Sequence, residues 1–217
     1  MALIGNLRHR PVRRLTHLFV GLVLYGFSMA LMVRSGLGLN PWDVLHQGLS
    51  RLTGLSMGTV VIAVGALVLL AWIPLRQRPG LGTIANVIVI GLAVDATLAL
   101  LPAGGPLPLR IGLLVAGIVG NGVATALYLG ARLGPGPRDG LMTGLVARRP
   151  DLSLRLIRTA IEIGVLALGA VLGGTVGLGT IAYALAIGPL TQLFLRPFDV
   201  AEPNPPAPER IALAPTT

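Results

Sequence analysis

Long apolar runs recur along this chain, and they restrict its fold more than any other feature. A helix of about 20 apolar residues crosses a hydrocarbon core of roughly 30 Å. The runs are continuous rather than alternating, which favours helices over membrane strands. The sequence therefore predicts an all-α polytopic membrane protein with six transmembrane helices, at residues 15–35, 57–75, 82–101, 110–131, 156–173 and 178–195.

Composition agrees with a membrane protein, because only 12% of the residues are charged and the mean hydropathy is +0.81. Soluble domains carry about 25% charged residues. The net charge of +9 is assigned to cytoplasmic loops rather than to nucleic-acid binding. We therefore expect the lipid bilayer as the surroundings and no nucleic-acid partner. The chain has no cysteine, which excludes disulfides and thiolate metal sites.

The arginines predict the orientation of the spans by the positive-inside rule. If the N-terminus is cytoplasmic, the outer flanks hold only Arg34, Arg51 and Arg110. Residues 1–14 then form a basic cytoplasmic flank without a signal-peptide cleavage site, and the Pro-rich residues 198–217 form a disordered cytoplasmic tail. The cytoplasmic flanks hold Arg8, Arg10, Arg13, Arg14, Arg76, Arg78, Arg132, Arg138, Arg148, Arg149, Arg155, Arg196 and Arg210.

An internal duplication is visible in "GLGTIANVIVIG" at residues 80–91 and "GLGTIAYALAIG" at residues 177–188, 97 positions later. Upstream the offset becomes 96, and glycines such as Gly21 and Gly26 match Gly117 and Gly122. Such small residues allow helices to approach closely in lipid. Each copy, 15–101 and 110–197, holds three spans. An odd number of spans forces the second copy to enter the membrane from the opposite side, so we predict two inverted three-helix repeats.

One segment in each copy is too short to cross the membrane. It reads "GLGLNPWDVLHQGLSRLTGLS" at residues 36–56 and "LGPGPRDGLMTGLVARRPDLS" at residues 133–153. Pro at the first turn and Asn40 before it predict a helix over residues 41–52 of roughly 18 Å, with a copy over 137–147. These helices either lie at the interface or enter the membrane as half-helices, and in inverted-repeat transporters such helices point at the substrate. The candidate binding residues are Asn40, Pro41, Trp42, Asp43, His46, Pro137, Arg138 and Asp139.

The chemistry of these residues favours a cationic or proton-coupled ligand over a phosphate. A helix N-terminus attracts anions, but the carboxylates of Asp43 and Asp139 partly cancel that field. His46 follows Asp43 by three residues, so the two side chains share a helical face and can share a proton. The counterpart of His46 is Met142, which argues against a symmetric mechanism. Ordinary helix capping also explains Pro and Asp at these positions, so a purely structural role stays open.

Polar residues within the spans are costly, and they normally face a partner or a water-filled cavity. Arg158 and Glu162 have the i, i+4 spacing of a local ion pair. Asp95 is predicted either at the outer interface or in a cavity, and Asn121 is predicted to bond between helices. The intramembrane candidates are Asp95, Asn121, Arg158, Glu162 and Gln192, of which Gln192 is the copy of Asp95.

No motif for a metal, a cofactor or nucleophilic catalysis is found in the sequence. The chain has three histidines and no His-Glu-x-x-His or Walker spacing. The glycine-rich "GLGTIA" segments precede membrane spans and follow no strand, so they are not dinucleotide loops. We therefore expect no metal, no cofactor and no enzymatic activity.

With "GLGLNPWDVLHQGLS" and two "GLGTIA" segments, the chain resembles the YczE/YitT-type family of bacterial integral membrane proteins up to about residue 197. The second copy departs from this pattern, with Pro137-Arg138-Asp139-Gly140 in place of Pro41-Trp42-Asp43-Val44. The resemblance implies the bacterial cytoplasmic membrane, with both termini cytoplasmic as the arginines predict. It supplies no catalytic or binding residues.

Two functions remain open at this stage. The first is a small secondary transporter or permease, because paired short helices lie in an inverted duplication. The second is a membrane accessory or regulatory protein, in which the basic residues Arg148, Arg149 and Arg155 contact a protein partner or anionic lipid. A homodimer is considered for either function, because six helices enclose little space.

Overall fold

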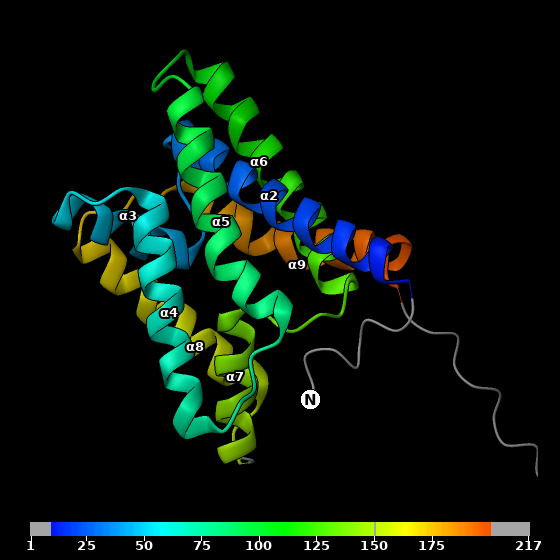
Figure 1. Cartoon of the computed structure of the whole chain (residues 1–217). Coiled ribbons are helices and arrows are strands. Elements are labelled where there is room, and N and C mark those ends of the chain that lie inside the picture. Colours follow the sequence, from blue (N-terminus) through cyan, green and yellow to red (C-terminus); the bar gives the residue numbers. More distant parts are fainter. Residues whose placement is uncertain (1–9, 150, 201–217) are drawn as a thin grey trace, which may run out of the picture.

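The fold is entirely helical in the part of the chain that the computed structural model describes, residues 10–149 and 151–200. This confirms the predicted all-α class. Figure 1 shows the arrangement of the helices. The eight helices of this part are α2 (Pro11–Ser35), α3 (Pro41–Thr53), α4 (Met57–Leu75), α5 (Leu81–Leu100), α6 (Leu107–Gly130), α7 (Pro137–Arg148), α8 (Leu154–Val171) and α9 (Leu178–Phe198).

Five helices of the described part are long and apolar enough to cross a membrane, namely α2, α4, α5, α6 and α9. They match five of the six predicted spans. The remaining predicted span, 156–173, corresponds to the 18-residue helix α8. Its 18 residues include three charged ones, Arg155, Arg158 and Glu162, and this charge content distinguishes it from the other five.

Both predicted short helices are present. Asn40 accepts a hydrogen bond from the backbone N–H of Asp43 at 3.0 Å, which confirms the predicted N-cap of α3. The N-cap of α7 is Gly136, whose position has no capping side chain. In α3, the seven consecutive residues 42–48 are all buried. Because seven residues cover every direction around a helix, the first two turns of α3 lie inside the bundle and not flat on its surface.

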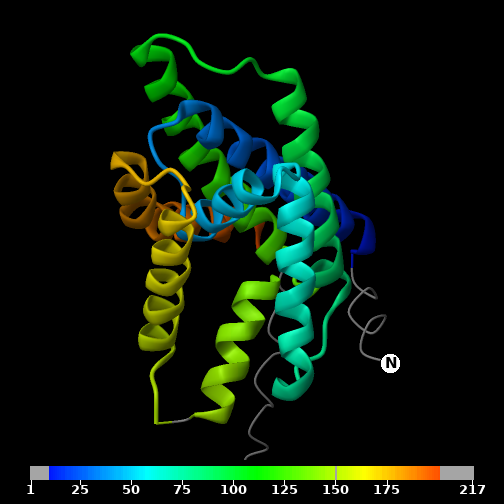
Figure 2. The ribbon, with the colours of Figure 1, turned by 90° about the vertical axis from the view of Figure 1, so that its left-hand side faces the viewer.

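Helices α2 and α6 form the central pair, and glycine allows them to touch (Figure 2). A Cβ at Gly21 would lie 2.8 Å from the backbone nitrogen of Tyr128, and a Cβ at Gly117 would lie 2.9 Å from the carbonyl oxygen of Ser28. Neither position has room for a side chain. The predicted close approach at these small residues is confirmed. Helix α5 packs on the outer side of α2, and α9 packs on the outer side of α6.

The remaining helices pair across the two halves, taking α2–α5 as the first half and α6–α9 as the second. Helix α3 packs on α8, while α7 packs on α4. In the α4–α7 contact, the ring of Trp72 leaves room only for glycine at Gly140. In the α3–α8 contact, Gly169 occupies the place equivalent to Trp72 and lies against the backbone of Leu45. A large residue in one interface is thus matched by glycine in the other.

The two "GLGTIA" segments make the same contact in each half. The N–H of Gly82 donates to the carbonyl oxygen of Leu133 at 2.8 Å, and the N–H of Gly179 donates to that of Leu37 at 2.8 Å. Each carbonyl belongs to the loop that precedes the short helix of the other half. The repeated motif therefore joins the start of α5 to the loop before α7 and the start of α9 to the loop before α3.

Glycine at the next position of each loop adopts backbone angles that other residues rarely accept. Gly38 has φ +127° and Gly134 has φ +125°. A Cβ at Gly38 would lie 2.7 Å from the backbone nitrogen of Thr180, and one at Gly134 would lie 2.8 Å from Oγ1 of Thr83. Both loops thus need glycine for the turn and for the close contact with the "GLGTIA" segment.

The chain ends of the described part differ slightly from the predicted boundaries. Helix α2 begins at Pro11, inside the predicted flank 1–14, and α9 runs to Phe198. Val200 is buried, and the carboxylate of Asp199 holds the Arg132 guanidinium by two hydrogen bonds of 2.8 and 2.7 Å. This carboxylate raises the pKa of Arg132. The predicted basic residues 1–9 and disordered residues 201–217 lie outside the described part.

Candidate functional site

A cavity of about 490 Å³ lies between the two halves, where the first turns of α3 and α7 meet. Seven helices contribute to its wall: α2, α3, α5, α6, α7, α8 and α9. Of the residues predicted from the sequence, the wall contains Asn40, Pro41, Trp42, Pro137, Arg138, Asp139, Arg158, Glu162 and Gln192. It also contains Tyr25, Asn86, Ile90, Thr125, Tyr128, Leu129, Gly136, Met142, Tyr183, Ala184, Ile187, Gly188 and Thr191.

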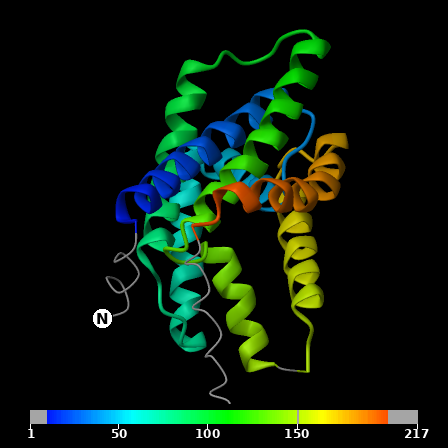
Figure 3. The same ribbon diagram turned by 90° about the vertical axis from the view of Figure 1, so that its right-hand side faces the viewer.

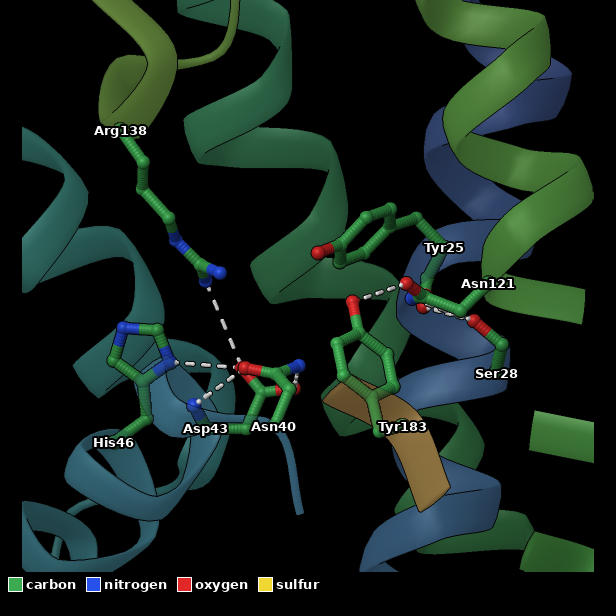
Figure 4. Close-up of polar contacts among 8 residues, drawn as sticks. All are labelled: Tyr25, Ser28, Asn40, Asp43, His46, Asn121, Arg138 and Tyr183. Atoms are coloured by element: carbon green, nitrogen blue, oxygen red, sulfur yellow. Dashed lines mark hydrogen bonds and ion pairs between the residues drawn. The ribbon is translucent and has the colours of Figure 1, made fainter. Parts of the chain in front are cut away.

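Asp43 lies just behind this wall and is completely buried. Its carboxylate accepts a hydrogen bond from the side-chain amide of Asn40 and lies 3.2 Å from Nδ1 of His46. The predicted pairing of His46 with Asp43 is therefore present. Figure 4 shows that these side chains converge with Arg138 on one carboxylate. The carboxylate is held by side chains, while the backbone N–H of Asp43 is already bonded to Asn40.

Arg138 joins the two short helices electrostatically. One guanidinium nitrogen lies 3.6 Å from Oδ1 of Asp43, and the guanidinium carbon lies 4.9 Å from the centre of the Trp42 ring. Arg138 belongs to α7, whereas Trp42 and Asp43 belong to α3. The Arg138 side chain is partly exposed while that of Asp43 is fully buried, so removing Arg138 would leave a buried carboxylate without its nearest cationic partner. The pair therefore couples the beginnings of α3 and α7 at the cavity wall.

Asp139 is the second carboxylate of the pair predicted at the short-helix starts. It accepts a hydrogen bond of 3.2 Å from the hydroxyl of Tyr128, a residue of α6. Asp139 lines the cavity directly, unlike Asp43. The two equivalent aspartates thus differ, since one is held behind the wall and the other faces the space.

A polar network crosses from α9 to α2 beside the cavity. The hydroxyl of Tyr183 donates to Oδ1 of Asn121 at 2.9 Å, and the amide of Asn121 donates to Oγ of Ser28 at 3.1 Å. Figure 4 shows the hydroxyls of Tyr25 and Tyr183 pointing into the same region. The prediction that Asn121 bonds between helices is confirmed, and Asn121 itself lies outside the cavity wall.

The charged residues of α8 reach the opposite side of the cavity. Nε of Arg158 lies 2.9 Å from Oε1 of Glu162, which confirms the predicted local ion pair. Both residues line the cavity together with Gln192 of α9. The cavity wall thus carries both signs of charge. Three carboxylates lie at or just behind it, those of Asp43, Asp139 and Glu162, compared with two guanidinium groups, those of Arg138 and Arg158.

Asp95 lies away from this cavity and caps α4, and its predicted position at the outer interface stays a prediction. Its carboxylate oxygens accept hydrogen bonds from the hydroxyl of Ser56 at 2.6 Å and from the N–H of Gly58 at 2.7 Å. It thereby satisfies a free N–H in the first turn of α4. Asp95 is therefore not part of the cavity, although its copy Gln192 is.

Sequence reasoning missed Tyr25 and Tyr183 as site residues, although the repeat contains a signal for both. Tyr25 matches Asn121 at an offset of 96, and Asn86 matches Tyr183 at an offset of 97. A Tyr and an Asn are thus exchanged between equivalent positions, and all of these residues except Asn121 line the cavity. All three tyrosines of the chain line it: Tyr25, Tyr128 and Tyr183.

The apolar helices and the polar cavity between them define a helical integral membrane protein. Residues 12–196 match the family of unknown function DUF6198, and the chain belongs to this family. The chain is 43% identical over 178 residues to an uncharacterized protein of Haemophilus influenzae, covering 82% of this chain and 81% of the relative. It is 32% identical over 192 residues to the uncharacterized membrane protein YczE of Bacillus subtilis, covering 88% and 87%.

A third relative is the uncharacterized protein YyaS of Bacillus subtilis, 29% identical over 183 residues, which cover 81% of this chain and 89% of the relative. No solved structure matches the chain. The resemblance to a YczE-type family is thereby confirmed.

Proposed function

We propose that this protein is a small secondary transporter or permease made of two inverted three-span repeats. The observation that supports it most is the cavity of about 490 Å³ at the meeting point of two short helices, one from each half. In inverted-repeat transporters, short or interrupted helices at matching positions point at the substrate. Here these helices bring Arg138, Asp43 and Asp139 to the cavity.

Reciprocal contacts support the inverted repeat. Exchanging the halves exchanges the α2–α5 contact with α6–α9, and the α3–α8 contact with α7–α4. The same exchange relates Gly82–Leu133 to Gly179–Leu37. These pairs are what a two-fold axis between the halves requires. With three spans in each half, that axis lies in the membrane plane.

Helix α8 serves as the sixth span in this proposal. Its length of 18 residues corresponds to about 27 Å of helix. Arg158 and Glu162 pair with each other and line the cavity. Charged residues within a span are tolerated when they pair with each other and face a cavity. Both termini are then cytoplasmic and the membrane is the bacterial inner membrane, as the arginine distribution favours.

The wall favours a small organic cation, alone or exchanged for protons. Three carboxylates at or behind the wall outnumber two guanidinium groups. Tyr25, Tyr128 and Tyr183 line the same cavity, and aromatic rings attract cations. The carboxylates of Asp43 and Asp139 also oppose the anion preference of the two helix starts.

The test is flux into proteoliposomes containing a pH-sensitive dye, with a panel of primary amines and quaternary ammonium ions. We expect at least one cation to produce flux that falls at least about tenfold in Asp139→Asn and Asp43→Asn, because a neutral side chain removes the charge that attracts it. Asp199→Asn, outside the cavity wall, is the matched control. Flux unchanged in both cavity variants would remove these aspartates from the mechanism.

A membrane accessory or regulatory protein is the second candidate. Arg148, Arg149 and Arg155 are exposed near the end of α7 and the start of α8, as binding to an acidic protein or anionic headgroups requires. Recovery of a stoichiometric protein partner, lost in the triple Gln variant, would favour this function. A homodimer in membranes is compatible with either candidate, and neither needs enzymatic chemistry.

A further inference from the structure

Two basic side chains converge on one carboxylate oxygen of Asp43. Nδ1 of His46 lies 3.2 Å from Oδ1, and a guanidinium nitrogen of Arg138 lies 3.6 Å from the same atom. The other carboxylate oxygen accepts a hydrogen bond from the amide of Asn40. Because an ionised carboxylate only accepts hydrogen bonds, Nδ1 of His46 carries the hydrogen in this contact. In neutral His46 the free lone pair is therefore on Nε2.

His46 lines a second hollow, of about 30 Å³, beside the main cavity. Figure 4 shows that its other ring nitrogen, Nε2, points away from Asp43. Trp42, Pro137 and Arg138 belong to the walls of both spaces, so the two spaces are neighbours. A hollow of this volume is large enough for a water molecule. His46 can therefore take up or release a proton on the side away from Asp43.

The charged groups that act on His46 are Asp43 of its own helix and Arg138 of α7. Helix α7 lies between α4 and α8 (Figure 3). Among the described residues, α4 and α5 contribute no titratable side chain to the hollow. Helix α8 also packs on α3, but its Arg158 and Glu162 line the main cavity instead. A second buried cation beside Arg138 is unfavourable, so His46 is neutral in this arrangement.

The main cavity has one carboxylate without a cationic partner. Its two guanidinium groups already pair with Asp43 and Glu162. Asp139 accepts a hydrogen bond from a tyrosine hydroxyl, but it has no ion-pair partner among the described residues. With neutral His46, the wall therefore has a surplus of one negative charge. Either a monovalent cation beside Asp139 or a proton on His46 balances that surplus.

This proton site is present in one half of the chain alone. The copy of His46 in α7 is Met142, and the copy of Arg138 in α3 is Trp42. A thioether is only a weak hydrogen-bond acceptor and an indole N–H only a donor, so neither copy supplies a basic group. The duplication therefore provides a single His–Asp–Arg cluster for each cavity.

We infer that His46 is the site at which a proton binds in exchange for the cation, one proton for each monovalent cation. This rests on the proposed transporter function. The proton adds to the lone pair of Nε2 and later leaves from the same atom. Once charged, His46 competes with Arg138 for Oδ1 of Asp43. The guanidinium is then less compensated and opposes a cation at the neighbouring Asp139, so proton and cation exclude each other.

Histidine titration by NMR of the purified full-length protein tests the proton site without any substrate. The chain has three histidines, and His46→Gln identifies the signal of His46. We expect its proton affinity to rise on the order of tenfold in Arg138→Gln and to fall by a similar factor in Asp43→Asn, because neighbouring charges change the stability of the imidazolium. His17 lines neither space, so its titration is the internal control.

Flux into proteoliposomes with an enclosed pH-sensitive dye tests the exchange. Tetramethylammonium and tetraethylammonium are suitable probes because they carry no exchangeable proton, so the dye reports only protons that the protein moves. We expect about one proton to leave for each cation that enters. This ratio should be kept in His17→Gln, the matched control, and the proton counterflux per cation should be lost in His46→Gln.

The two measurements separate failure of the inference from failure of the proposed function. A His46 signal that does not titrate between about pH 4 and 9 would overturn the inference, as would equal proton affinity in the wild type and Arg138→Gln. An unchanged proton-to-cation ratio in His46→Gln would refute the proton site and leave transport. Titration of His46 as expected, without flux of any cation of the panel, would refute transport and with it the exchange.

Discussion

Gly91 in α5 and Gly188 in α9 are equivalent positions at an offset of 97. Substitutions at these two positions measure how differently the two helices are packed, as a difference in thermal stability. Both are interior helix positions, so Gly→Ala gives each a similar intrinsic gain of about 1 kcal/mol. A Cβ at Gly91 would lie 2.7 Å from the carbonyl oxygen of Gly58, and one at Gly188 would meet nothing within 4 Å among the described residues. The difference between Gly91→Ala and Gly188→Ala therefore isolates the packing of α5 on α4.

The clash at Gly91 involves backbone, so relief requires α4 to move. Overpacking of this kind costs about 1–3 kcal/mol. Taking about 2 kcal/mol, Gly91→Ala should unfold roughly 4–8 °C below Gly188→Ala for a chain of this length. Scanning fluorimetry of both purified variants in one detergent measures the difference. Equal unfolding temperatures, or a more stable Gly91→Ala, would refute the closed α4–α5 interface.

Three further substitutions test contacts that hold the short helices and the α6–α9 end, each by the same thermal assay. Asn40→Ala should destabilise the protein by about 1 kcal/mol because the N-cap of α3 is lost, and no loss would contradict the cap. Trp72→Phe removes the 2.9 Å bond to the carbonyl oxygen of Pro137 and should cost about 1–3 kcal/mol; an unchanged Tm would argue against it. Arg132→Gln breaks an exposed pair with Asp199 and should cost less than about 1 kcal/mol. A larger loss of stability would show that this pair contributes more than an exposed ion pair normally does.

Local features of the sequence predicted the elements well. Asn40 and Pro41 marked the start of α3, and apolar length marked five of the spans, because capping and span length depend on neighbouring residues alone. The i, i+4 spacing of Arg158 and Glu162 predicted their ion pair for the same reason. Gly21 and Gly117 predicted close helix approach, although not that α2 and α6 are the two helices in contact.

Contacts between distant segments could not be read in the same way. The approach of Arg138 to Asp43 joins helices from different halves, and no local spacing encodes it. The capping of α4 by Asp95 depends on how α5 lies beside α4. The cavity position of Tyr183 could have been found from the repeat, since it replaces Asn86 at the end of an otherwise identical motif.

The central claim is that equivalent positions of the two halves lie on opposite sides of the membrane. Pro79 and Val176 are such a pair at an offset of 97, and both are exposed. Single variants Pro79→Cys and Val176→Cys should be compared for labelling by a membrane-impermeant maleimide in intact cells. We predict labelling of Val176→Cys in intact cells and of Pro79→Cys only after the membrane is opened. Labelling of both variants from the same side would contradict the inverted repeat.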